Sequence, residues 1–209
     1  MAQEGLKLQG PRMEDDEADL HRPRRRRFLH LDRWECVARP QYARSCGVSS
    51  LVSAWNFLYS TLGPCGALPP LTQERALSLL GFEPPFEAIE FGRLAGNAAL
   101  LRWFHELNRV MGCSGSCGFF LKLLGADVTH ADTQEALAAA LDALLDGLHS
   151  ETEVFIYHCH NHYFLPIGYE LTPASPEDAV GPCLPPPGRS PGAAEAWIAI
   201  GEPSRAKPP

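Results

Sequence analysis

The stretch RPQYARSCGVSSLVSAWNFLYSTLG, residues 39–63, contains the clearest helical pattern in the chain. Its apolar residues recur at spacings of three and four, which places them on one face of an α-helix. They are Val48, Leu51, Val52, Trp55, Leu58, Tyr59 and Leu62. Gly63 and Pro64 then end the pattern. The stretch therefore predicts a long helix packed on a core, with Cys46 in its first turn.

Cys46 lies where a helix favours a thiolate. A cysteine attacks a carbonyl group only after it has lost its proton, and the pKa of a thiol falls at a helix N-terminus and beside an imidazolium. Gly47 removes side-chain bulk next to the sulfur, so that a substrate backbone can approach. The sequence therefore predicts that Cys46 is a nucleophile, against the alternative of a small, buried structural thiol.

Length and composition indicate the class of protein. The chain has 209 residues, 45% of them hydrophobic, which is enough for one domain with its own core. No run of 18 apolar residues occurs, so we expect no membrane span. The N-terminal residues are polar and contain no signal peptide, which predicts a cytoplasmic or nuclear location or both. The seven cysteines are then expected to be reduced thiols.

Residues 1–30 differ in character from the rest of the chain. An acidic run from Glu14 to Asp19 precedes a basic run that includes Arg24–Arg27, and we expect a disordered, charged tail. Residues 31–209 then form the domain, with 11 basic and 19 acidic residues. That balance argues against a large phosphate-binding surface. A nuclear-localisation or nucleic-acid contact through Arg24–Arg27 stays open.

Helices are expected early in the chain and strands later. Further helices are predicted over 72–81, 97–110 and 132–148, with Thr72, Asn97 and the pair Asp132 and Glu135 as N-terminal caps. Strands are predicted over 119–124, 153–158, 162–170 and 197–200, with a Pro-rich loop over 171–195. This order predicts an α+β fold, in which N-terminal helices pack on a C-terminal antiparallel sheet.

The partners of a reactive thiol are sought among polar residues near the later strands. His162 begins a predicted strand, which would hold its ring rigidly as a general base. Glu202 follows the last strand and, in an antiparallel sheet, can lie beside His162 and orient its ring. Asn161 is a rival for that role, but adjacent residues on a strand face opposite ways. Gln41 can stabilise an oxyanion together with the Cys46 backbone N–H.

A metal site is the main alternative for these side chains. The candidate ligands are Cys113, Cys117, His158, Cys159, His160 and His162. Their spacing matches no common zinc pattern, and neighbouring residues on a strand alternate between faces. We therefore expect neither a metal ion nor a cofactor.

The same residues carry a resemblance to papain-like cysteine peptidases. Gln41, then Cys46-Gly47 at the start of a long helix, then His162 with Gly168-Tyr169, then a polar residue before Pro203 follow the chain order of that class, in particular of its bacteriocin-leader-processing branch. The resemblance implies a papain-like fold and hydrolysis of a peptide or isopeptide bond in a protein or peptide substrate. In that class the third residue is Asn or Asp, whereas this sequence has Glu202.

A closer resemblance is to the basic immunoglobulin-like variable motif-containing protein family, over roughly residues 34–205. It is carried by RPQYARSCGVSSLVSAWNFLYSTLG, LPPLTQERAL, LGFEPPFE, YHCHNHYF and GEPSR. The family name suggests an immunoglobulin-like segment, but a long helical first half does not suit a sandwich of about seven short strands.

The papain-like resemblance implies the function of an intracellular thiol hydrolase. The alternatives are a catalytically silent binding module of the same fold and a contact made by the Arg-rich tail.

Overall fold

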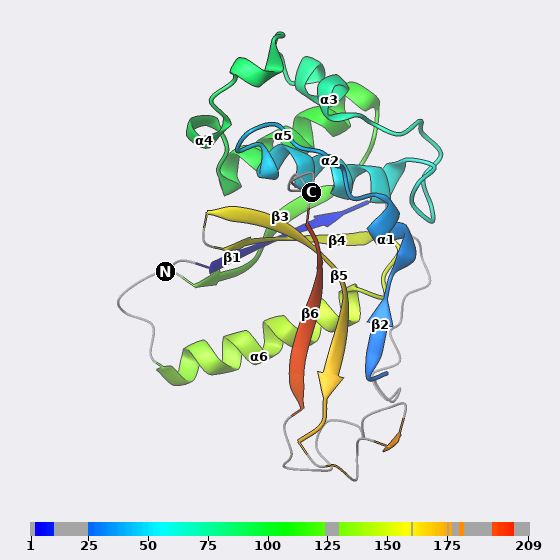
Figure 1. Ribbon diagram of the computed structural model, residues 1–209, viewed down its shortest axis with the longest axis vertical. Coiled ribbons are helices and arrows are strands. Elements are labelled where there is room, and N and C mark those ends of the chain that lie inside the picture. Colours follow the sequence, from blue (N-terminus) through cyan, green and yellow to red (C-terminus); the bar gives the residue numbers. More distant parts are fainter. Residues whose placement is uncertain are drawn as a thin grey trace, which may run out of the picture.

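A six-stranded sheet runs through the molecule, with helices on both of its faces (Figure 1). The computed structural model describes residues 3–10, 25–123, 130–159, 161–174, 176, 180–181 and 194–202. The strands are β1 (Gln3–Gln9), β2 (Arg27–Leu29), β3 (Ser116–Leu123), β4 (Glu153–Cys159), β5 (His162–Thr172) and β6 (Glu195–Gly201). Their order is β2-β5-β4-β1-β3, with β6 also paired to β5, and each pairing is antiparallel.

The helices complete an α+β fold, which confirms the predicted class. They are α1 (Leu31–Glu35), α2 (Cys46–Tyr59), α3 (Gln73–Leu79), the short 3-10 helix η1 (Phe86–Ala88), α4 (Phe91–Leu94), α5 (Asn97–Met111) and α6 (His130–Gly147). Helices α2 to α5 lie on one side of the sheet and α6 crosses the other side (Figure 1). The prediction of a C-terminal sheet is wrong in part, because β1, β2 and β3 all precede α6.

Helix α2 lies at the centre of the core, and all of its residues are buried. Its apolar face packs as predicted up to Tyr59, with Val48, Leu51 and Trp55 fully enclosed. The helix ends at Tyr59, so the prediction was wrong for Leu62, which lies beyond it and is exposed. Its polar face is buried as well, because short polar side chains bond to the loops around it. Asn56, for example, donates to the Leu71 carbonyl at 2.9 Å and accepts from the Leu71 amide at 2.7 Å. The helix therefore anchors loops on one side while it fills the core on the other.

The predicted caps fare differently from one another. The Thr72 side chain caps α3 by accepting a hydrogen bond from the Arg75 amide at 3.1 Å, as expected. Asn97 is the first residue of α5 rather than its cap, which is Gly96. Helix α6 begins at His130, before Asp132. The side chains of Asp132 and Glu135 lie outside the described residues, so that capping box stays a prediction.

The largest difference from the sequence prediction lies at the N-terminus. Residues 3–9 form β1, which pairs with β4 on one side and with β3 on the other. Leu6 and Leu8 are only 0% and 1% exposed. The expected disordered tail over 1–30 is therefore wrong for β1 and β2. Two leucines are too short a pattern to predict a strand, but pairing on both edges satisfies the backbone and fixes which face is buried.

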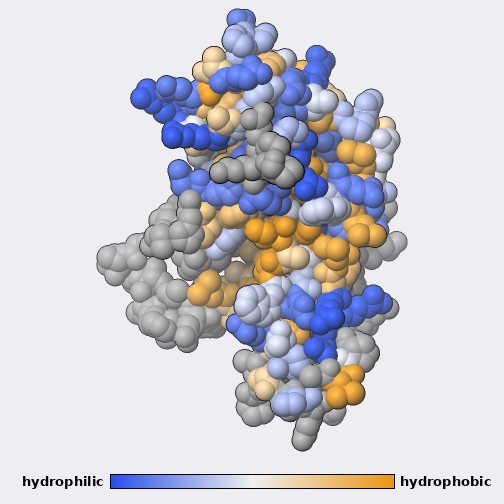
Figure 2. Space-filling model, in the orientation of Figure 1, coloured by the Kyte–Doolittle hydropathy of each residue, from blue (hydrophilic) through white to orange (hydrophobic). Residues whose placement is uncertain are grey.

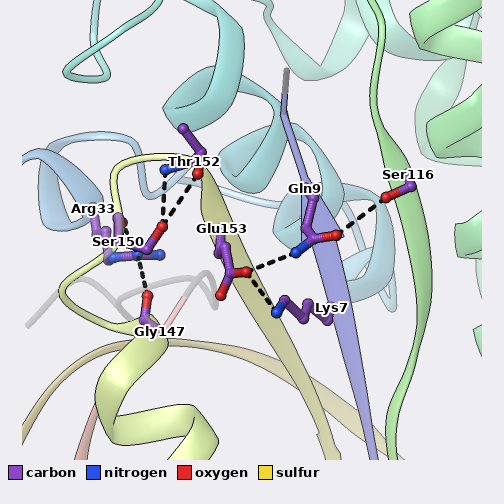
Figure 3. A network of polar contacts seen from close by, with 8 residues as sticks. All are labelled: Lys7, Gln9, Arg33, Ser116, Gly147, Ser150, Thr152 and Glu153. Atoms are coloured by element: carbon purple, nitrogen blue, oxygen red, sulfur yellow. Dashed lines mark hydrogen bonds and ion pairs between the residues drawn. The ribbon is translucent and has the colours of Figure 1, made fainter. Parts of the chain in front are cut away.

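Polar contacts on the other face of β1 hold its register (Figure 3). Gln9 donates from Nε2 to Glu153 Oε1 at 2.6 Å, and Lys7 Nζ lies 2.6 Å from the same oxygen. Ser116 donates from Oγ to Gln9 Oε1 at 3.2 Å. Side chains from β1, β3 and β4 therefore meet in one network. Residues 11–24, which include the acidic run, lie outside the described residues.

A buried arginine connects α1 to the end of α6. Arg33 is 1% exposed and donates from Nη2 to the carbonyl oxygens of Gly147 at 3.1 Å and Ser150 at 2.7 Å (Figure 3). Its guanidinium also lies 4.2 Å from the Phe57 ring centre. Burial lowers the pKa of Arg33 to about 9, so the group still carries its charge at neutral pH. It supplies a positive charge where the α6 carbonyls gather.

Figure 2 shows apolar side chains gathered where β5 and β6 cross the middle of this face. The exposed large apolar residues of β2, α1 and β6 are Leu29, Leu31, Trp34, Trp197 and Ile200.

No helix within the described ranges is long and apolar enough to span a membrane. The six described cysteines are all free thiols.

Candidate active site

Cys46 is the first residue of α2 and lines a pocket of about 830 Å³. Its side of the pocket is the loop before the helix, which includes Gln41 and Arg44. The segment 87–95 forms the facing wall, and Asn161, His162 and Tyr163 from the start of β5 complete the lining. Three of the four residues expected to carry chemistry, Gln41, Cys46 and His162, therefore lie around one cavity.

Glu202 reaches the same region through the pairing of β5 with β6. The antiparallel register places Gly201 opposite Leu165, so the next residue of the chain lies beside the start of β5. Glu202 Oε1 is 2.7 Å from His162 Nε2. A carboxylate can only accept, so Nε2 carries a hydrogen, and in the neutral ring the lone pair lies on Nδ1. The neutral ring can therefore act as a base through Nδ1.

Asn161, the rival for this role, belongs to the turn between β4 and β5. Its φ angle of 60° lies in the left-handed region, which asparagine adopts more readily than most residues. The carboxylate bonded to His162 is that of Glu202. Asn161 therefore belongs to the turn, and the residue that contacts the His162 ring is Glu202, the one that the alternation of strand faces had favoured.

The electrostatics of Cys46 differ from the prediction. Cys46 is 7% exposed, and burial raises the pKa of its thiol. The backbone N–H groups of Tyr163, Gly47 and Cys46 oppose that rise in the pKa, whereas the Glu202 charge adds to it. The expectation of a lowered pKa is therefore wrong for the protein at rest, because loss of water outweighs the helix terminus. Among the described residues no hydrogen bond joins Cys46 to His162.

Gly47 also has a different role from the one expected. A Cβ at this position would lie 3.1 Å from Leu100 Cδ1 and 3.4 Å from Tyr163 Cδ2. The absence of a side chain therefore lets α2 pack closely on α5 and β5, and Gly47 is not among the residues that line the pocket. Tyr163 is held in turn by Asn97, whose Oδ1 accepts from the Tyr163 hydroxyl at 2.8 Å. Sequence reasoning missed this support, because no local pattern connects residues so far apart.

Gln41 lies in the pocket with Cys46, but its amide has no settled partner. Its Oε1 atom is buried and accepts no hydrogen bond in the described part of the protein. A buried acceptor without a donor is costly, so a ligand that donates a hydrogen bond to this oxygen would be favoured. Gln41 also lines a second pocket of about 900 Å³, together with Tyr42 and Gln73. The oxyanion role of Gln41 stays a prediction.

The candidate metal ligands that the structure describes form no cluster suited to a metal ion. No group of three or more His, Cys, Asp or Glu side chains suited to a metal ion occurs within the described ranges. His158 stacks on Tyr163 with ring centres 4.1 Å apart, and Cys117 Sγ lies 3.3 Å from His105 Nε2. His160 lies outside the described residues.

The site is thus defined by a buried cysteine at a helix start and a histidine bonded to a carboxylate, on an α+β domain. The chain belongs to the basic immunoglobulin-like variable motif-containing protein family, whose sequence profile matches residues 23–209. The family predicted from sequence is therefore confirmed. The matched region begins after β1, although both strands that pair with β1 lie within it.

Several proteins that carry the family name are similar to this chain. The protein from Xenopus tropicalis is 49% identical over 185 residues, which cover 88% of this chain and 35% of the relative. The human protein is 48% identical over 187 residues, with the same coverage. The protein from Giardia intestinalis is 35% identical over 167 residues, covering 78% of this chain and 55% of the relative. The chain thus spans about a third of the vertebrate relatives. No solved structure matches it.

Proposed function

We propose that this domain has a papain-like fold and is a thiol hydrolase acting on a peptide or isopeptide bond. The observation that carries the proposal is the 2.7 Å contact of His162 Nε2 with Glu202, beside the pocket that contains Cys46. The arrangement of elements supports it: the cysteine begins the central helix, the histidine begins a strand, and the carboxylate follows the strand paired to it.

In the proposed reaction His162 Nδ1 accepts the thiol proton as Cys46 Sγ attacks the substrate carbonyl carbon. The Cys46 backbone N–H and the Gln41 amide stabilise the oxyanion. His162 then protonates the leaving amine, and a thioester remains. A water molecule deprotonated by His162 attacks the thioester and releases the acid and the thiol. Because the pKa of Cys46 is raised, the proton moves during attack rather than before it.

Labelling with an iodoacetamide probe at pH 7, read at Cys46 by mass spectrometry, tests the proposed role of His162. His162→Ala should slow labelling by at least roughly tenfold, since a general base is removed. Asn161→Gly is a matched control, because it changes the adjacent pocket residue and suits the turn. A protein or peptide mixture should be cleaved by the wild type and not by Cys46→Ala. Equal labelling rates in wild type and His162→Ala would show that Cys46 is structural.

A second candidate function is a catalytically silent binding module of the same fold. It is favoured by the raised pKa of Cys46 and by the lack of a hydrogen bond to His162 in the described chain. Under this alternative, the pocket binds a peptide without cleaving it. The mixture would then remain intact, while peptides would still protect Cys46 from the probe.

A nuclear or nucleic-acid contact through Arg24–Arg27 has less support. Arg26 donates from Nη1 to the Gly181 carbonyl at 3.2 Å, and Arg27 Nη2 lies 2.8 Å from Glu170 Oε1. Arg26 and Arg27 are thus already bonded within the domain.

The proposal includes a cytoplasmic or nuclear location and a protein or peptide as the substrate.

A further inference from the structure

Arg44, which lies two residues before Cys46, has an unfavourable backbone for its side chain. The Ser45 amide donates to the Tyr42 carbonyl at 3.2 Å, so residues 42–45 form a tight turn with Arg44 at its third position. The φ angle of Arg44 is 60°, where turns favour glycine or asparagine. Strained backbone of this kind concentrates at functional sites. Turn chemistry does not explain an arginine here, so the side chain is the feature to examine.

The Arg44 side chain reaches toward the facing wall of the pocket. A Cβ on Gly92, in α4, would lie 3.4 Å from Arg44 Cδ and 3.8 Å from Arg44 Nη1. The stem and guanidinium therefore lie within ordinary contact distance of α4 at Gly92. Both Arg44 and Gly92 line the pocket that contains Cys46 and His162. Arg44 thus lies beside the pocket in which a substrate of Cys46 would bind.

Arg44 differs from the other basic groups of this pocket in having no charged partner. Arg93 Nε lies 3.1 Å from Glu90 Oε2, and His162 is bonded to Glu202. Glu87 also lines the pocket but forms no ion pair with Arg44. Among the described residues that line this pocket, the Arg44 side chain alone is a cation without a hydrogen bond or ion pair. A guanidinium offers five donors in a fork that matches a carboxylate.

We propose that Arg44 determines specificity by binding a carboxylate of the substrate next to the bond that Cys46 attacks. The identity of that bond rests on the proposed function, whereas carboxylate binding beside Cys46 can be tested without it. The substrate class is then a polypeptide with an acidic side chain near the scissile bond, or a chain end with a free carboxylate. Arg44 acts by recognition and takes no part in proton transfer.

The first test compares two alkylating reagents at Cys46, negatively charged iodoacetate and neutral iodoacetamide. The ratio of their rates cancels the thiolate fraction and reports the local charge. Arg44→Gln should lower this ratio by roughly three- to tenfold, and Arg44→Lys should restore most of it. Arg102→Gln, in α5 and outside the residues that line the pocket, is the matched control and should change the ratio little, because it removes the same charge outside the pocket. The same ratio in wild type and Arg44→Gln, at equal melting temperature, would overturn the proposal.

The second test identifies the source of the carboxylate from protection of Cys46 against iodoacetamide. The probes are three matched peptides: one with central aspartates and an amidated end, its asparagine counterpart, and that counterpart with a free C-terminal carboxylate. Better protection by the first or the third peptide, lost in Arg44→Gln, supports a side chain or a chain end respectively. Equal protection by all three would overturn the substrate class. Failure of the His162→Ala labelling test would reject the hydrolase but leave these two results intact.

Discussion

Strand β1 and the group formed by Cys46, His162 and Glu202 are two regions with opposite relations to the sequence. No motif marks β1, yet it is a central strand with two enclosed leucines. Motifs mark the other three residues, yet His162 and Glu202 are half-exposed. The difference teaches that sequence motifs mark the candidate site of this protein. A strand that fills part of its core has no motif, and its sequence resembles a polar tail.

Deletion of residues 1–10 should have the largest effect on this comparison. It removes both leucines from the core and leaves β3 and β4 with unpaired edges. We expect loss of cooperative unfolding or a fall of more than about 4 kcal/mol in the free energy of unfolding. Circular dichroism during thermal unfolding measures it, with deletion of residues 1–2 as control. An unchanged melting temperature would mean that β1 contributes nothing to the fold.

Leu6→Ala sharpens the same contrast within β1. Truncation of a fully buried leucine should cost about 2–5 kcal/mol of unfolding free energy. Lys7→Ala, on the other face, removes a partly exposed ion pair with Glu153 and should cost about 1 kcal/mol or less. Urea denaturation of both variants gives the comparison. Similar losses would show that the polar network, rather than the buried leucines, holds the strand.

Glu202→Gln should separate chemistry from stability at the other region. The pair with His162 is partly exposed, so the free energy of unfolding should change by about 1 kcal/mol or less. The orientation of the ring should suffer more, with alkylation of Cys46 slower by roughly tenfold or more. Glu90→Gln, which changes a carboxylate that lines the pocket but does not contact His162, is the control. If both variants react like the wild type, Glu202 does not orient His162.

The smallest expected effect concerns pH. Burial raises the pKa of Cys46, so the folded state favours the neutral thiol. The raised pKa of Cys46 stabilises the folded state fully at pH values below the pKa of the unfolded thiol. This stabilisation is lost as the pH rises through the pKa of the folded thiol. The alkylation rate of Cys46 should therefore reach its midpoint at higher pH in the folded protein than in a peptide of residues 41–50. The reverse order would mean that the helix terminus and an imidazolium dominate.

Local patterns predicted much of the described fold. The apolar stripe of α2 as far as Tyr59 and the Thr72 cap of α3 depend on neighbours within a few residues, and both are present. The strands that begin at Glu153 and His162 were likewise predicted from the local sequence, and both are present. The meeting of Glu202 with His162 was also predicted, because antiparallel pairing of consecutive strands makes it a short-range consequence of topology.

The sequence by itself determined the family, the α+β class, the main helices and the chain order of the candidate site residues. Each of these features depends on local spacing or on sequence similarity, and both can be read without knowledge of the tertiary contacts. The tertiary structure alone decided the insertion of β1, the raised pKa of Cys46, the packing role of Gly47 and the placement of Arg44 against Gly92. These depend on which distant surfaces meet and where water is excluded. Neither is written in the spacing of residues along the chain.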